Sequence, residues 1–189
     1  MIDLWNIWLM KTINELKEYN EYRNKMALHT IMESFFSLDE GKADPEVLEL
    51  IQNDEFDTNP AEFKKSLSKS KHQELLTDYD TKELKKMKLF KLKGYNIGFA
   101  LKKKDGKHQE IVAVHNNEPN VKGIGKDLMK AAIKNGGAYL DHFSGYLDDF
   151  YSSLGFVEYD RDKFDPQYDE DGSFRAKYGE ADVVYRKLK

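Results

Sequence analysis

Two glycines near the middle of the chain stand where a strand-like pattern gives way to a helical one. Gly123 and Gly125 belong to the stretch Asn-Val-Lys-Gly-Ile-Gly, residues 120–125. A helix N-terminus presents unpaired backbone N–H groups and partial positive charge, and glycine lets a phosphate approach that backbone closely. Lys122 and Lys126 add positive charge. The pattern therefore predicts an anion site, with a plain tight turn as the alternative. It lacks the spacing of a P-loop and the third glycine of a dinucleotide-binding fingerprint.

A second stretch, Phe-Tyr-Ser-Ser-Leu-Gly-Phe at residues 150–156, follows Gly125 by 25 residues. Read alone, it is a short helix that Gly155 ends and a strand that Phe156 opens. Tyr151 is then a packed aromatic residue whose hydroxyl group has a neighbouring partner. A tyrosine can also transfer a proton in catalysis, so this position has a chemical interpretation as well.

Composition narrows the classes of protein. The chain has 189 residues, 40% hydrophobic and 34% charged, and no cysteine. The absence of cysteine excludes disulfides, thiolate metal sites and a cysteine nucleophile. No apolar run approaches the roughly 20 residues of a membrane span. Residues 1–10 lack the basic start and cleavage site of a signal peptide. We therefore expect a cytoplasmic protein that does not enter a membrane.

Charge is distributed in blocks. Residues 61–104 carry 13 basic and 5 acidic side chains, all the bases being lysine. Solvated helix faces explain such a block, and binding of an anionic partner such as tRNA or DNA is the alternative. Residues 160–172 are strongly acidic but lack the spacing of an EF-hand loop. We interpret them as an acidic surface loop and predict no metal site.

Periodicity divides the chain into a helical region, residues 1–75, and a mixed region, residues 76–189. Three or four short helices are expected in the first region, with Asp44 as one N-cap and Thr58 or Asn59 as another. These helices could form a homodimer contact. From residue 80 the expected order is a helix with Thr81 or Asp80 as its cap, a β-hairpin turning at Asp105-Gly106, then helix, strand, helix, strand, irregular acidic loop and strand. This order predicts an α/β (α+β) fold with a mixed sheet.

Together, the two chemical stretches resemble the GNAT superfamily, the Gcn5-related N-acetyltransferases. That family has a glycine loop after a strand and, later, the pattern F-Y-x-x-x-G-F, which residues 120–125 and 150–156 match. Residues 80–188 also resemble a group of GNAT-like proteins encoded by phages and prophages, through residues 81–84, 98–102, 135–137, 140–143 and 182–184. The resemblance implies a mixed central sheet flanked by helices, with the N-terminal helices as an extension.

The resemblance implies acetyl-CoA as co-substrate and an amine as acceptor. The pyrophosphate would lie on the backbone N–H groups of residues 121–126, and the pantetheine arm would pair with residues 111–115. The implied CoA site comprises Val112, Val114, Asn120, Val121, Lys122, Gly123, Ile124, Gly125, Lys126, Ser144 and Tyr151. Tyr151 would protonate the departing thiolate.

Three side chains are candidates for the base that deprotonates the amine, namely Glu110, His115 and Asp141. His115 has the ordinary pKa best suited to that task. Asn120 stands where the family usually has Arg or Gln, and Ser144 where many members have Asn. These departures leave open a second hypothesis, an inactive GNAT-fold interaction module. The lysine-rich block of residues 61–104 leaves open a third, a GNAT-like enzyme that modifies nucleic acid.

Overall fold

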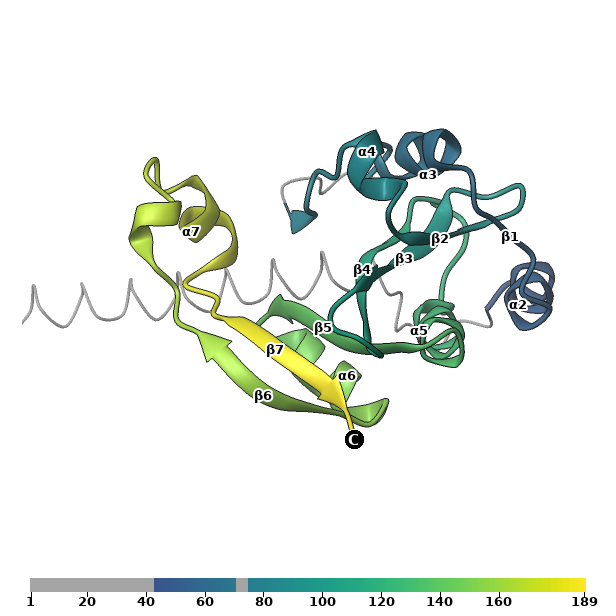
Figure 1. Cartoon of the computed structure of the whole chain (residues 1–189). Helices are drawn as coiled ribbons and strands as arrows, with labels where there is room; N and C mark the ends of the chain where they lie inside the picture. The colour runs from purple at the N-terminus through teal and green to yellow at the C-terminus, as the bar shows by residue number, and fades with distance from the viewer. Residues whose placement is uncertain (1–42, 71–74) are drawn as a thin grey trace, which may run out of the picture.

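The architecture is a seven-stranded mixed sheet with helices on both faces (Figure 1). The computed structural model describes residues 43–70 and 75–189. The strand order is β1-β2-β3-β4-β5-β7-β6. The strands are β1 (Phe56–Asp57), β2 (Lys88–Leu92), β3 (Ile97–Lys103), β4 (Gln109–Asn116), β5 (Gly137–Phe143), β6 (Phe156–Asp162) and β7 (Val183–Leu188). The helices are α2 (Pro45–Gln52), α3 (Pro60–Leu67), α4 (Thr81–Leu84), α5 (Gly125–Lys134), α6 (Tyr146–Ser153), α7 (Ser173–Tyr178) and the 3-10 helix η2 (Pro166–Tyr168). The predicted fold class is confirmed.

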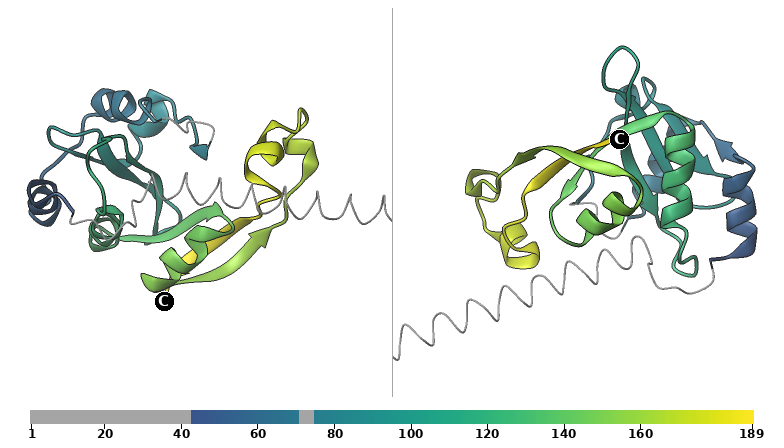
Figure 2. Two further views of the ribbon diagram at one scale, coloured as in Figure 1. Left: turned by 180° about the vertical axis from the view of Figure 1, so that it is seen from behind. Right: turned by 90° about the horizontal axis from the view of Figure 1, so that it is seen from below.

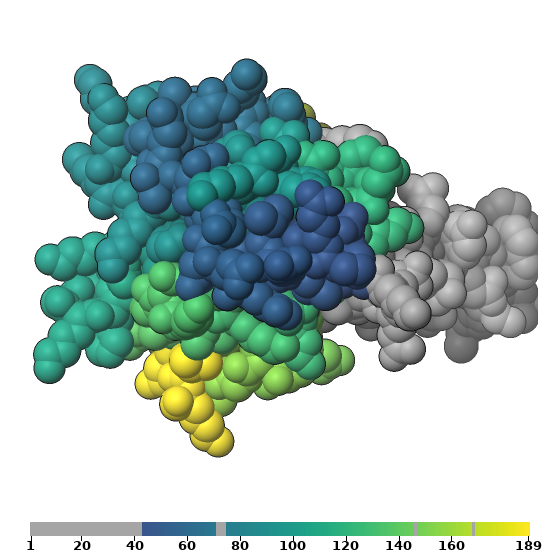
Figure 3. All heavy atoms as spheres, turned by 90° about the vertical axis from the view of Figure 1, so that its right-hand side faces the viewer, coloured from purple at the N-terminus to yellow at the C-terminus, as the bar shows by residue number. Residues whose placement is uncertain are grey.

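Two apolar clusters hold the helices against the sheet. Figure 2 shows the arrangement of these helices and strands from two further sides. The larger cluster joins α2, α5 and α6 to the strands and contains Ile97, Ile111 and Met129. The smaller cluster joins α3 and α4 to β2, β3 and β4, with Phe63 at its centre. Helix α2 packs against α5, and α3 packs against β2 (Figure 3). Residues 43–70 thus share their core with the sheet.

The helix starts in the first half of the chain follow from local capping. The Asp44 carboxylate accepts hydrogen bonds from the backbone N–H groups of Glu46 and Val47, and Pro45 occupies the first turn. Asn59 caps α3 in the same way, so Asn59 and not Thr58 is the cap. Asp80 caps α4, and Glu83 bonds back to its backbone in a capping box. These predictions are confirmed for α2, α3 and α4.

The strand pattern is confirmed with three corrections, the first of which is β1, a two-residue strand in the region predicted to be helical. The hairpin of β3 and β4 turns at residues 104–108, where the Asp105 side chain accepts backbone hydrogen bonds from Lys107 and His108. Strand β2 was not predicted, because its lysine-rich sequence continues the pattern of the preceding helix. The loop predicted to be irregular between β6 and β7 contains η2 and α7. The helices predicted within residues 1–42, with their suggested dimer contact, lie outside the described residues.

Strands β4 and β5 are the parallel neighbours of the sheet, and they separate. Their pairing comprises Gln109 with Gly137 and Glu110 with Tyr139, after which the two strands diverge. At the junction a Cβ atom on Gly137 would overlap the Ile111 side chain, so glycine permits the close approach there. The sheet therefore consists of two arms. The N-terminal arm is β1–β4, and the C-terminal arm is β5, β7 and β6.

A β-bulge shapes β4 beside the gap. Ala100 pairs with Val112 and Gly98 pairs with His115, so two residues of β4 lie opposite Phe99 alone. Ala113 has φ 52°, a left-handed conformation that non-glycine residues rarely adopt. Such a conformation costs on the order of 1–3 kcal/mol and occurs preferentially at functional sites.

Candidate active site

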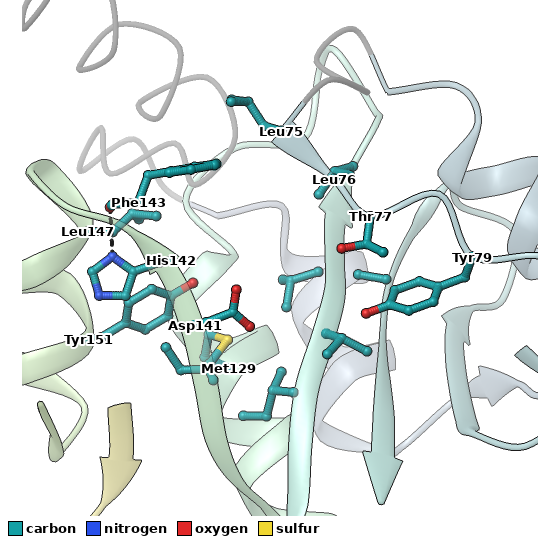
Figure 4. A pocket seen from close by; sticks show the side chains of 15 residues that line it. Leu75, Leu76, Thr77, Tyr79, Met129, Asp141, His142, Phe143, Leu147 and Tyr151 are labelled. Atoms are coloured by element: carbon teal, nitrogen blue, oxygen red, sulfur yellow. Dashed lines mark hydrogen bonds between the residues drawn. The ribbon is translucent and has the colours of Figure 1, made fainter. Parts of the chain in front are cut away.

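A cavity of about 130 Å³ occupies the gap between β4 and β5 (Figure 4). One wall is β4 from Ile111 to Val114, and the other is β5 from Leu140 to Phe143. The segment before α4 covers one side of the cavity, and α5 and α6 supply the other. The remaining lining residues are Leu75, Leu76, Thr77, Tyr79, Met129, Leu147 and Tyr151. The separation of two parallel strands thus creates a lined space at the centre of the sheet.

Tyr151 extends from α6 into this cavity, and its hydroxyl group points toward Asp141 in Figure 4. The side chain is buried, with 5% exposure. Burial raises the pKa of the Tyr151 phenol above its ordinary value of 10.0, and the charge of Asp141 raises it further. The phenol therefore remains protonated throughout the physiological range. The structure places this predicted site residue at the cavity.

Asp141 belongs to the β5 wall of the cavity. The residue as a whole is exposed. Its carboxyl group is nevertheless partly shielded from water, which raises the pKa of Asp141, and the nearby charge of Glu110 raises that pKa further. Glu110 does not line the cavity; its carboxylate binds the Lys104 ammonium group at 2.7 Å. Of these two predicted bases, Asp141 is therefore the one that faces the cavity.

Tyr79 and Thr77 complete the polar part of the lining, and the sequence did not predict either. The Tyr79 hydroxyl group points into the cavity from the side opposite Tyr151, with Asp141 between them in Figure 4. Burial raises the Tyr79 pKa; a hydrogen bond with Thr77 opposes this increase, and the charge of Asp141 adds to it. Tyr79 stands just before a helix cap, where no spacing pattern marks it as a site residue.

His142 is a further cavity residue that the sequence did not predict. Its Nδ1 atom lies 2.8 Å from the backbone oxygen of Phe143, and the Arg186 Nε–H group donates to its Nε2 atom, also at 2.8 Å. These partners require the neutral tautomer with the proton on Nδ1. Burial lowers the pKa of His142, which favours the same neutral form. The ring packs against Tyr151 with centroids 5.0 Å apart, so His142 helps to position that phenol.

His115 lies away from the cavity. It is buried against α3, where its Nε2 atom is 2.8 Å from the Ser66 hydroxyl group and its ring contacts Phe63 edge-on. Its Nδ1 atom is 2.9 Å from the backbone oxygen of Ala113, within the bulge. Burial lowers the His115 pKa to about 4. Because both ring nitrogens are engaged and the ring does not line the cavity, the structure does not bring this predicted base to Tyr151.

The glycine loop follows β4 and leads into α5. The Val121 and Ile124 side chains are buried and anchor the loop, whereas Asn120, Lys122 and Lys126 are exposed. Gly123 has φ 72°, which glycine adopts without strain. Ile124 occupies the N-cap position of α5, where its aliphatic side chain cannot accept a hydrogen bond. The Asp127 N–H group donates to the Ile124 backbone oxygen at 3.1 Å, so the first-turn amides to which an anion could bind are those of Gly125 and Lys126.

Among the other predicted CoA contacts, Val112 and Val114 line the cavity. Ser144 instead joins β5 to the residue before β7: its hydroxyl group accepts from the Asp182 N–H group at 2.9 Å. Within residues 43–70 and 75–189, no three His, Asp or Glu side chains meet as a metal site requires. No helix in the same ranges is long and apolar enough to cross a membrane.

No family model and no curated protein matches the chain. Among solved structures, the chain is similar to the crystal structure of N-acetylglutamate synthase from Neisseria gonorrhoeae complexed with coenzyme A and L-arginine. The two sequences are 17% identical and the TM-score is 0.44. The match covers 69% of this chain and 32% of that chain, so the chain spans about a third of that protein's length.

Proposed function

We propose that this protein is an acyl-CoA-dependent N-acyltransferase that transfers an acyl group, acetyl in the first instance, to an amine. The observation that carries the proposal is the gap between β4 and β5, with Tyr151 and Asp141 at one cavity and the glycine loop directly after β4. The GNAT resemblance of residues 120–125 and 150–156 supports the same function. A phage or prophage origin and a location in the host cytoplasm belong to this proposal.

The β4 wall fits the extended arm of acetyl-CoA. Beyond Glu110, the described part of β5 no longer pairs with β4, so the facing N–H and C=O groups of β4 can accept an added strand. The pantetheine arm contains amide groups that can pair in this manner. The Val112 and Val114 side chains line the adjoining space. The bulge at Ala113 interrupts the regular strand at that point and turns its backbone groups.

The start of α5 fits the pyrophosphate. Gly123 and Gly125 allow close approach, and the Ile124 side chain does not cap the N–H groups of Gly125 and Lys126. Lys122 and Lys126 attract a phosphate by their positive charge. Unlike an arginine guanidinium group, a lysine ammonium group does not form a planar, two-point contact with it. Asn120 contributes an amide where the family usually has a longer side chain. We therefore assign the phosphate contact chiefly to backbone groups of residues 121–126.

Bound acetyl-CoA supplies an activated acetyl thioester. In the overall transfer a C–N bond forms, the C–S bond breaks, and the ammonium group of the acceptor loses two protons. Sulfur takes one proton and water takes the other. Asp141 is positioned to accept a proton from the ammonium group, and Tyr151 to donate one to sulfur. Burial disfavours the charged forms of both a phenol and a thiol, so it favours a neutral thiol as the product of the transfer.

Isothermal titration of the full chain with acetyl-CoA tests the proposal first. We expect saturable binding in the micromolar to low millimolar range. Replacing Gly123 with Ala should weaken that binding, because an L-residue strains the left-handed conformation at φ 72°. A wild-type protein that leaves acetyl-CoA unbound at millimolar concentration would refute the proposal.

The Tyr151→Phe variant tests the proton donor. We expect kcat to fall about 100-fold or more while the Kd for acetyl-CoA stays within a factor of two or three, because the lost hydroxyl group acts in proton transfer. Tyr159→Phe is the matched control, since Tyr159 is 40% exposed and lies outside the cavity. Equal kinetics in wild type and Tyr151→Phe would remove Tyr151 as the acid.

Two alternatives make different predictions. An interaction module would bind no CoA and would capture a specific host or phage partner. A nucleic-acid-modifying enzyme would bind tRNA or DNA through the lysine-rich block of residues 61–104, and its affinity would fall steeply with salt. The same titrations, with nucleic acid at two salt concentrations, distinguish these hypotheses from the proposed enzyme.

A further inference from the structure

The acceptor side of the cavity has a specific chemical character. Its polar groups are the Asp141 carboxylate, the Tyr79 and Tyr151 hydroxyl groups and the Thr77 hydroxyl group. Figure 4 shows the Asp141 carboxylate between the two phenols. A carboxylate flanked by hydroxyl oxygens is a site for an ammonium group, which has three donors and no acceptor.

The rest of the lining is apolar. The side chains around the polar group are aliphatic or aromatic, namely Leu75, Leu76, Ile111, Val112, Ala113, Val114, Met129, Leu140, Phe143 and Leu147. His142 also lines the cavity, but its nitrogens are engaged by Phe143 and Arg186. A polar substituent on the acceptor would therefore lose its water without gaining a partner, which costs free energy.

Cationic side chains do not line this space in the described structure. The two lysines whose charges influence Asp141 have other partners: Lys104 binds Glu110 at 2.7 Å, and the Lys102 ammonium group lies 5.9 Å from the centre of the Tyr79 ring. An anionic group on the acceptor would therefore face the Asp141 carboxylate without a cation in the lining to offset the repulsion.

We infer that the acceptor is an amine whose ammonium group binds Asp141 and whose remaining part is apolar and free of anionic groups. This inference rests on the proposed function, which supplies the acyl donor. The cavity of about 130 Å³ is smaller than a typical small-molecule pocket of roughly 300–1,000 Å³, so it suits a short alkyl or aryl amine, or the amine end of a longer molecule.

Matched acceptor pairs test the inference. Isopentylamine and leucine differ by one carboxylate, as do benzylamine and phenylglycine. With acetyl-CoA saturating, we expect kcat/KM for each amine to exceed that for its amino acid by about tenfold or more. In Asp141→Asn, turnover of isopentylamine should fall at least about tenfold while the Kd for acetyl-CoA is unchanged. Asp149→Asn, an exposed acid of α6 outside the cavity, is the matched control and should behave as wild type.

A direct binding measurement separates this inference from the proposed function. Ligand-detected NMR with isopentylamine and leucine, without acetyl-CoA, should show binding of the amine, its loss in Asp141→Asn and its retention in Asp149→Asn. That result supports the amine site even if titration finds no acetyl-CoA binding, which would refute the transferase proposal alone. Acetyl-CoA binding combined with equal or better use of leucine or phenylglycine would overturn the acceptor inference alone. Failure to bind either the amine or acetyl-CoA would overturn both.

Discussion

The two arms of the sheet are held together by different chemistry. In the N-terminal arm, the rings of Phe90 and Phe99 stack with centroids 4.6 Å apart, and Phe56 meets Phe99 edge-on at 5.6 Å. The C-terminal arm is organised around Arg186, which is 5% exposed. Arg186 donates to His142 at 2.8 Å, to the Ser152 hydroxyl group at 2.9 Å and to the Asp148 carboxylate at 2.7 Å.

Each arm also buries one histidine, but only His142 lines the cavity. His115 is held by the Ser66 hydroxyl group of α3 and by the Ala113 carbonyl group. It therefore stabilises the bulge of β4 from the side of the sheet that α3 covers. His142 connects Arg186 to the ring of Tyr151. In the proposed reaction, the N-terminal arm would hold the extended arm of acetyl-CoA along β4, and the C-terminal arm would position Tyr151 and Asp141.

Replacing Arg186 with Met should have the largest effect on stability. The variant removes the cation but leaves Asp148, Ser152 and the Nε2 atom of His142 without their partner. Breaking one side of a buried charged pair typically costs about 3–5 kcal/mol. Because the Asp148 side chain is 30% exposed, the cost here should lie at the lower end, about 3 kcal/mol. We expect a decrease of that order in the free energy of unfolding, measured by urea denaturation, with a reduced kcat because the support for Tyr151 is lost.

Arg161→Met is the matched control in the same arm. Arg161 pairs with Glu158 and Asp182, but its side chain is 28% exposed. Exposed pairs contribute about 1 kcal/mol or less, so this variant should remain close to wild type. Equal losses for Arg186→Met and Arg161→Met would contradict a special role for the buried network.

His115 should make stability depend on pH. Its pKa is about 4 in the folded state, against 6.5 for an ordinary histidine. Between these values the unfolded chain binds a proton that the folded chain does not, so stability falls as pH decreases from 6.5 to 4. At 1.36 kcal/mol per pH unit, the full loss is about 3 kcal/mol. Urea denaturation at several pH values measures it.

The His115→Gln variant is the control for this pH dependence. Glutamine keeps polar groups near Ser66 but does not titrate, so the loss of stability between pH 6.5 and pH 4 should become smaller. If wild type and His115→Gln showed the same slope, other groups would account for the acid sensitivity. The burial of His115 would then not be the cause of the pH dependence of stability.

The sequence predicted features that depend on neighbours in the chain. Asp44, Asn59 and Asp80 cap helices because their side chains reach amides two or three residues later. The turn at Asp105 is local in the same sense. Strand β2 was missed because its lysines resemble the preceding helical pattern, and its pairing with β3 is what makes it a strand.

The cavity depends on contacts that no local pattern contains. The sequence marked Asp141 and Tyr151 through a family resemblance, and the structure brings them together. Tyr79 joins them from a segment before α4, and its contribution follows from the packing of α3 and α4 on the sheet. His115 had a suitable ordinary pKa, but burial against Phe63 and Ser66 changes that pKa and removes the ring from the cavity.

A smaller effect should arise within the apolar arm at Gly98. A Cβ atom there would overlap the backbone oxygen of Phe90 and lie 3.2 Å from the His115 ring. Since a backbone atom cannot yield as a flexible side chain can, Gly98→Ala should cost about 1–3 kcal/mol in the free energy of unfolding. Gly106→Ala is the control, because a Cβ atom in the hairpin turn would meet nothing within 4 Å.

A double variant tests whether the two arms are stabilised independently. If they are, the losses in the free energy of unfolding caused by Gly98→Ala and by Arg186→Met should add when the two changes are combined. Strong non-additivity would show that the two arms share their stabilisation across the cavity.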